Sequence, residues 1–166
     1  MDQELYSIIF SSATGNTKLL AETLHGALPL EQCAYFGPWN REIPETPVVY
    51  VGFWTDKGNA DPDTLALLKE LRNKKVFLFG TAGFGGSAEY FANILSAVQA
   101  ELDPSNTVVG TYMCQGRMPQ SVRQRYVAMK QQPNPASNLD MLIENFDRAL
   151  AHPDAGDLER LKQAVQ

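Results

Sequence analysis

Cysteine is scarce in this chain of 166 residues, which has only Cys33 and Cys114. Two cysteines are too few for a disulfide framework, and their spacing is not that of a metal site. Long apolar runs are also missing, since no window approaches the roughly 18 consecutive apolar residues of a transmembrane helix. The acidic start, Met1–Glu4, is unlike the basic start of a signal peptide. We therefore expect a cytoplasmic protein with no membrane partner.

Positive charge is in short supply as well. The chain has 14 basic and 19 acidic residues, a formal net charge of −5, so it repels phosphate backbones and we expect no nucleic-acid partner. A hydrophobic share of 44% with 20% charged residues is typical of a folded globular chain. Its length predicts a single domain over residues 1–166, with a core at 4–115 and a helical extension at 116–166.

Apolar runs and helical patterns alternate along the sequence. Short runs rich in β-branched and aromatic residues predict strands at 5–10, 33–36, 47–53, 75–79 and 107–114. Apolar residues at helical spacing predict helices at 17–28, 61–71, 87–102, 119–130, 139–151 and 157–165. This alternation indicates an α/β fold with a doubly wound, five-stranded parallel sheet. In such sheets ligands bind at the carboxyl ends of the strands, so the loops after the first, third and fourth strands are the candidate sites.

The loop after the first strand, Ser11–Thr17, is dense in hydroxyl groups. It precedes a helix whose first N–H groups and dipole favour an anion. The loop lacks the spacing of a Walker A motif and the glycines of a dinucleotide-binding turn. These residue types favour a phosphate group that is held by uncharged donors and is not transferred.

The same loop, Ser12-Ala13-Thr14-Gly15-Asn16-Thr17, resembles the S-x-T-G-N-T phosphate loop of flavodoxins, the electron carriers that bind flavin mononucleotide (FMN). Chain length, acidic charge and the five-strand alternation are similar to that family too. The resemblance implies FMN as cofactor and the strand order 2-1-3-4-5. It also implies that these six residues bind the cofactor, with all except Ala13 contacting its phosphate.

The loop after the fourth strand is similar to the flavodoxin pattern G-T-G-D-x-x-G-Y-A-[DE]-x-F, with Ser87 at the position of the stacking tyrosine. Phe84 either replaces that tyrosine against the flavin ring or packs within the protein. The cofactor-binding residues that the resemblance implies here are Thr81, Ala82, Gly83, Phe84, Gly85, Gly86 and Glu89.

The loop after the third strand resembles the flavodoxin pattern G-x-x-T-W, but Asp56 stands where the tryptophan is expected. Trp54 lies two residues earlier, where it either covers the ring or is buried beneath the loop. The implied cofactor-binding residues of this loop are Phe53, Trp54 and Thr55.

The resemblance implies an electron-transfer protein whose partners are a flavin reductase and an acceptor enzyme. The Gly52–Gly58 loop and the C-terminal extension resemble a bacterial flavodoxin-like subgroup associated with bilirubin reductase. We find no acid–base or nucleophile constellation in the sequence, and we predict no catalytic residue and no metal site. Two alternatives stay open: an FMN-dependent NAD(P)H:quinone-type reductase, and a flavodoxin fold that has lost flavin and acts as a binding module.

Overall fold

The computed structural model describes residues 4–84 and 87–165. Its sheet has five parallel strands in the order β2-β1-β3-β5-β6, which is the predicted order 2-1-3-4-5 once a short extra strand is set aside. These strands are β1 (Tyr6–Phe10), β2 (Cys33–Gly37), β3 (Val48–Asp56), β5 (Lys75–Ala82) and β6 (Thr107–Gln115). The sixth strand, β4 (Asn59–Ala60), pairs antiparallel with the end of β3 and was not predicted. Two residues after a tight turn carry no periodic pattern that a sequence can show.

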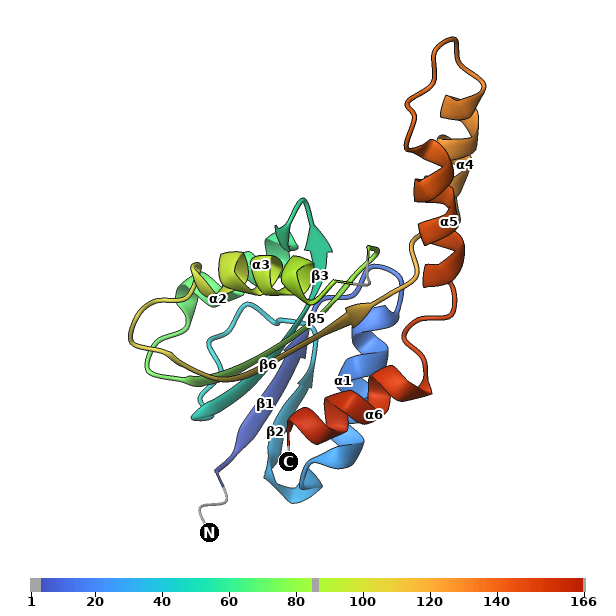
Figure 1. Cartoon of the computed structure of the whole chain (residues 1–166). Helices are drawn as coiled ribbons and strands as arrows, with labels where there is room; N and C mark the ends of the chain where they lie inside the picture. Colours follow the sequence, from blue (N-terminus) through green and yellow to red (C-terminus); the bar gives the residue numbers. More distant parts are fainter. Residues whose placement is uncertain (1–3, 85–86, 166) are drawn as a thin grey trace.

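Helices cover both faces of the sheet, which confirms the doubly wound prediction (Figure 1). The helices α2 and α3 pack on one face, while α1 and α6 pack on the other. The helices are α1 (Asn16–Ala27), α2 (Pro62–Glu70), α3 (Ala88–Gln99), α4 (Gln120–Lys130), α5 (Leu139–Ala149) and α6 (Ala155–Ala164), with a short 3₁₀ helix at Leu30–Gln32. The start of α2 shows why a helix begins where the sequence predicts it. The Asp61 carboxylate accepts a hydrogen bond from the Thr64 N–H, and Pro62 takes the first helical position.

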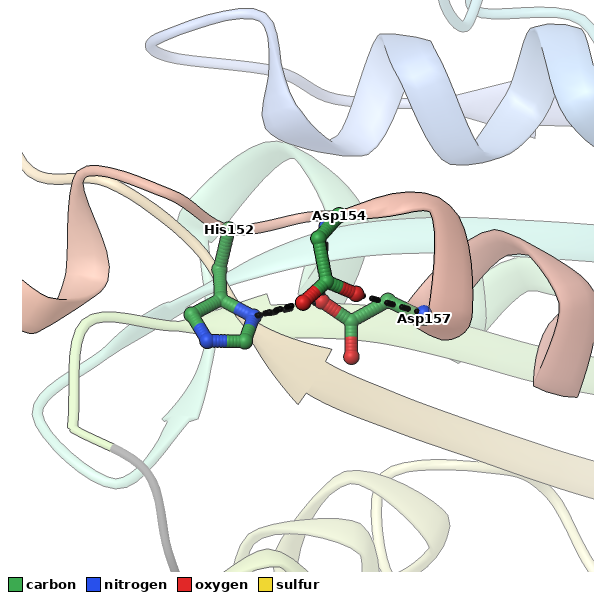
Figure 2. Close-up of side chains that lie close together, drawn as sticks. All are labelled: His152, Asp154 and Asp157. Carbon is green, nitrogen blue, oxygen red and sulfur yellow. Dashed lines mark hydrogen bonds and ion pairs between the residues drawn. The ribbon is translucent and has the colours of Figure 1, made fainter.

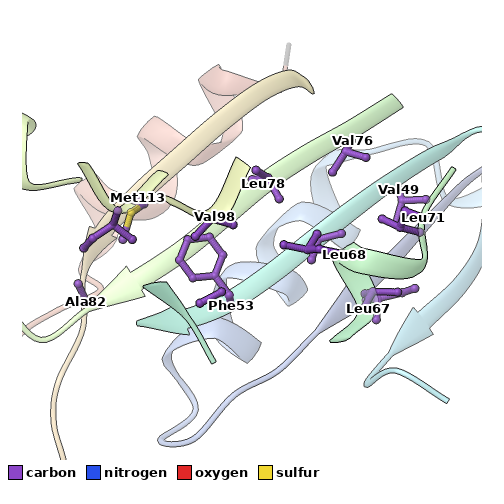
Figure 3. Packing of buried hydrophobic residues seen from close by; sticks show 14 residues of the cluster. Val49, Phe53, Leu67, Leu68, Leu71, Val76, Leu78, Ala82, Val98 and Met113 are labelled. Carbon is purple, nitrogen blue, oxygen red and sulfur yellow. The ribbon is translucent and has the colours of Figure 1, made fainter. Parts of the chain in front are cut away.

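The core lies in two layers, one on each side of the parallel strands. In the layer shown in Figure 3, Phe53 of β3, Leu68 of α2 and Leu78 of β5 are fully buried. A side chain at Gly80 would meet the Phe53 ring at 2.4 Å, so the glycine allows this ring to lie flat against the next strand. This packing fixes the carboxyl edge of the sheet, where the candidate loops begin.

Two of the strands run further toward that edge than predicted. β3 continues to Asp56 and β5 to Ala82, and Trp54 of β3 pairs with Thr81 of β5 in the parallel ladder. The sequence suggests loops there because the apolar runs end, but the ladder of backbone hydrogen bonds does not need apolar side chains. Trp54, Thr55 and Thr81 therefore lie on rigid strand ends.

The helices α4 and α5 form a hairpin that projects from the α/β body (Figure 1), and we call it the arm. Its helices are joined by the ion pairs Arg123–Asp147 and Lys130–Asp140. Within the C-terminal extension, α6 returns to the sheet, where it packs beside α1.

Candidate functional site

The three candidate loops meet at the carboxyl edge of the sheet around a pocket of about 320 Å³. This volume lies at the lower end of the range of small-molecule and cofactor sites. The predicted residues that line it are Ala13, Thr14, Asn16, Thr17, Trp54, Thr55, Thr81, Ala82 and Gly83. The structure therefore gathers residues from all three loops at one place.

The loop Ser11–Thr17, which we call the phosphate-type loop, is turned tightly by Gly15, whose φ of 91° is in the left-handed region that favours glycine. The Ser12 Oγ accepts from the backbone N–H groups of Gly15 at 3.1 Å and Lys18 at 3.3 Å. The N-cap residue Gly15 has no side chain to cap α1, and Ser12 takes only the N–H groups of Gly15 and Lys18. This helix end is therefore suited to an anion, as the sequence predicts.

Asn16 is the most informative residue of this loop. Its side chain is 6% exposed, its Nδ2 donates to the Arg117 carbonyl at 2.7 Å, and its Oδ1 has no hydrogen-bond partner among the described residues. The Thr14 Oγ1 donates to the same carbonyl at 3.3 Å. A buried acceptor without a donor is costly, and a bound ligand with a hydroxyl group would satisfy it. The sugar-alcohol chain of FMN carries such hydroxyl groups, whereas its phosphate, which only accepts, fits the N–H groups at the start of α1.

Thr17 holds the loop against the sheet. Its hydroxyl is almost fully buried and donates to the Phe53 carbonyl at 3.0 Å, with the Thr81 hydroxyl 3.4 Å away. A phosphate contact through this hydroxyl requires it to leave that carbonyl, so this role of Thr17 stays a prediction. The Phe53 side chain lies in the core, which leaves only its backbone for contact with a cofactor.

On the ring side, the half-buried Trp54 lines the pocket, and its backbone N–H donates to Asp61 at 3.2 Å. The Thr55 hydroxyl donates to the Thr81 carbonyl at 2.8 Å, which joins the ends of β3 and β5. Phe84 is 39% exposed and packs edge-on against Tyr90, with ring centroids 6.5 Å apart. Of the two aromatic candidates, Trp54 is the one that lines the described pocket.

Three other predicted residues are not part of the described pocket lining. Glu89 is exposed on the first turn of α3 and is not part of the described pocket lining. Gly85 and Gly86 lie outside the residues that the structure describes. Their roles in cofactor binding stay predictions.

Residues 116–119, which we call the strap, line the pocket and were missed by sequence reasoning. Gly116 packs so closely on the phosphate-type loop that a Cβ there would lie 2.4 Å from Asn16 Nδ2. The strap follows the carboxyl end of β6, and ligands bind at such ends in parallel sheets. That rule was the one signal in the sequence that could have identified these residues.

A second polar cluster, His152, Asp154 and Asp157, lies where the chain enters α6 (Figure 2). His152 Nδ1 is 2.6 Å from Asp157 Oδ2, and Asp154 and Asp157 form a capping box at the start of the helix. Burial raises the pKa of Asp157, but hydrogen bonds from His152, the Asp154 N–H and Arg160 outweigh it and hold the pKa below its ordinary value. Because these bonds use both carboxylate oxygens, the cluster serves to anchor α6.

The family model described as flavodoxin domain matches residues 7–166. This chain belongs to the flavodoxin family. The resemblance seen in the sequence is thereby confirmed, and FMN, the predicted cofactor, agrees with this membership. Over residues 4–84 and 87–165, no helix is both long and apolar enough to cross a membrane.

Two similar relatives are both named flavodoxin-like domain-containing protein BilS. The one from Clostridium symbiosum is 38% identical over 174 residues, covering 92% of this chain and 90% of the relative. The one from Clostridioides difficile is 26% identical over 155 residues, covering 91% and 88%.

Among solved structures, flavodoxin 2 from Bacillus cereus matches with a TM-score of 0.54 at 15% identity, covering 87% of this chain and 98% of that one. A flavoprotein from Lactobacillus acidophilus, solved in complex with FMN, matches with a TM-score of 0.52 at 15% identity, covering 66% and 93%. At these identities the two structures support the flavodoxin fold.

Proposed function

We propose that this protein binds FMN and carries electrons in the cytoplasm from a flavin reductase to an acceptor enzyme. The observation that carries the proposal is the pocket between the phosphate-type loop and the ends of β3 and β5. Asn16 lines it, and the buried Asn16 Oδ1 has no hydrogen-bond partner in the part of the chain that the structure describes. A bilirubin reductase is the candidate acceptor, on the resemblance of the Gly52–Gly58 loop and the C-terminal extension to that subgroup.

FMN, when bound, supplies the redox chemistry, and the protein supplies binding, orientation and control of solvent. The start of α1 and the hydroxyl groups of its loop would hold the phosphate without a full positive charge. Trp54 offers an aromatic face to the ring, and the Thr55–Thr81 hydrogen bond fixes the strand ends beside it. The strap closes the pocket from the side of β6.

The test begins with purified protein titrated with FMN and with riboflavin, which lacks the phosphate, followed by stepwise reduction. We expect FMN to bind more tightly and to take up electrons in two separate one-electron steps. Steady oxidation of NADH with a quinone by the protein alone would instead identify a reductase. A protein that binds neither flavin would be a binding module, and the proposal would be wrong.

A residue-level test uses two threonines of the same chain. On this proposal the Thr14 hydroxyl leaves the Arg117 carbonyl and donates to the phosphate, and Thr14→Val removes it. Hydrogen bonds to charged groups contribute about 1.5–3 kcal/mol, so FMN should bind roughly ten- to a hundredfold more weakly. Riboflavin affinity should change little. Thr23→Val is the matched control, because the Thr23 hydroxyl donates to the Leu19 carbonyl within α1 and Thr23 is not part of the described pocket lining. Equal losses for FMN and riboflavin would contradict the phosphate assignment.

A further inference from the structure

Residues 81–84 at the end of β5, which we call the ring-side loop, have one backbone carbonyl that accepts hydrogen bonds from two side chains outside this loop. The Gly83 carbonyl accepts from Gln115 Nε2 at 3.0 Å and from Asn145 Nδ2 at 3.1 Å. Gln115 also donates to Asn145 Oδ1 at 3.2 Å, so the two amides orient each other. Gln115 ends β6, whereas Asn145 lies on the arm helix α5.

The same loop position is enclosed on another side by the strap. A Cβ at Gly83 would lie 2.6 Å from Met118 Cγ and Sδ, so Met118 packs directly on this glycine. With a side chain against it and two donors on its carbonyl, Gly83 has little freedom to rotate its peptide. The peptide that follows it is therefore presented in one orientation.

That orientation has a chemical consequence for the next residue. The Gly83–Phe84 bond is trans, since among the described residues only His152–Pro153 is cis. In a trans peptide the C=O and N–H point in opposite directions, so the Phe84 N–H points away from Gln115 and Asn145. It donates to no acceptor within residues 4–84 and 87–165, and Gly83 itself lines the pocket. A hydrogen-bond donor is thus left available beside the proposed ring site.

We propose that Asn145 is a positioning residue for the flavin ring: by holding the Gly83 carbonyl, it aims the Phe84 N–H at an acceptor of the ring. The isoalloxazine ring carries carbonyl oxygens and ring nitrogens that accept hydrogen bonds, so it offers such an acceptor. This inference rests on the proposed function. The arm then contributes to the flavin site, because Asn145 of α5 donates a hydrogen bond to the Gly83 carbonyl of the ring-side loop.

The test substitution is Asn145→Asp, which keeps the shape and the acceptor for Gln115 but removes the donor to Gly83. Because the effect is on the ring side, FMN and riboflavin should both bind about five- to tenfold more weakly, the size expected for one hydrogen bond. Gln124→Glu on the exposed side of α4 is the matched control with the same change in charge, and it should bind both flavins as the wild type does.

A second readout follows the Phe84 amide proton by NMR in protein labelled with ¹⁵N. Riboflavin should shift this proton strongly in the wild type and much less in Asn145→Asp. If Asn145→Asp unfolds, Gln115→Glu removes the other donor to Gly83 and should act in the same direction.

The outcomes separate the two proposals. Wild-type protein that binds neither flavin would overturn the proposed function together with this inference. Wild-type protein that binds FMN, with Asn145→Asp indistinguishable from Gln124→Glu, would overturn only the role of Asn145. A loss confined to FMN would also overturn it, because that result places the effect at the phosphate.

Discussion

Gly116 is the position where a single methyl group should disturb both the stability and the site. A Cβ there would lie 2.4 Å from Nδ2 and 2.9 Å from Cγ of Asn16, well inside van der Waals contact. Asn16 cannot move away without losing its 2.7 Å bond to the Arg117 carbonyl. Overpacking of this kind costs about 1–3 kcal/mol, so Gly116→Ala should lower the free energy of unfolding by that amount.

The assay is unfolding of the flavin-free protein by heat and by urea. For a chain of this size, 1 kcal/mol corresponds to roughly 2–4 °C in Tm, so we expect a fall of about 2–12 °C. Gly26→Ala is the matched control: this glycine lies in α1 and a Cβ there meets nothing within 4 Å. Alanine in a helix is favoured over glycine by roughly 0.5–1 kcal/mol, so this variant should be stabilised.

Flavin binding gives the second measure of Gly116→Ala. Displacing Asn16 disturbs the phosphate-type loop, so FMN affinity should fall more than riboflavin affinity. If Gly116→Ala melts at or above the wild-type temperature while Gly26→Ala is stabilised as expected, the close packing of strap and loop is wrong.

Three further predictions concern other sites. Trp54→Leu should weaken FMN and riboflavin alike by roughly two- to tenfold, the size of an aromatic stacking contribution, and unchanged affinity would exclude Trp54 from the ring site. The pKa of Asp157 is lowered in the fold, so the stability that this carboxylate contributes is complete above about pH 4 and is lost on further acidification. Asp157→Asn should therefore show a smaller difference in urea stability between pH 7 and pH 3 than the wild type. The same difference in both proteins would contradict the role of Asp157 as an anchor of α6. Burial raises the pKa of Cys114 to about 12, so iodoacetamide at pH 8 should label the half-buried Cys33 first and Cys114 only in urea; equal labelling of the folded protein would contradict its burial.

The sequence was sufficient for the architecture because its signals there are local. Short apolar runs and helical spacing identified the five parallel strands and the helices between them, and the S-x-T-G-N-T loop pointed to the family and to FMN. The left-handed Gly15 and the start of α1 lie where that motif implies. Such features depend on neighbours within a few residues, which a sequence shows directly.

The missing parts of the site depend on contacts between distant residues. Asn16 and Arg117 are 101 positions apart, and Asn145 is 62 positions from Gly83. No spacing rule connects one carbonyl to a side chain so far away, so neither of these contacts, nor any part of the arm in the site, could be predicted. The same limit applies to Trp54 and Phe84, for which the sequence left open whether they contact the flavin ring or pack within the protein. The answer depends on the path of β3 for Trp54 and on the position of Tyr90 for Phe84.

The tip of the arm is a suitable place to attach a label to the protein. Residues 131–138, between α4 and α5, are all exposed, and the ion pairs of the arm join its helices to each other. Exposed turns of this kind tolerate insertions, because no buried backbone group is disturbed. A fluorescent label or affinity tag inserted at this tip would stand away from the sheet, and it would report on the binding of another protein without altering the strands that shape the pocket.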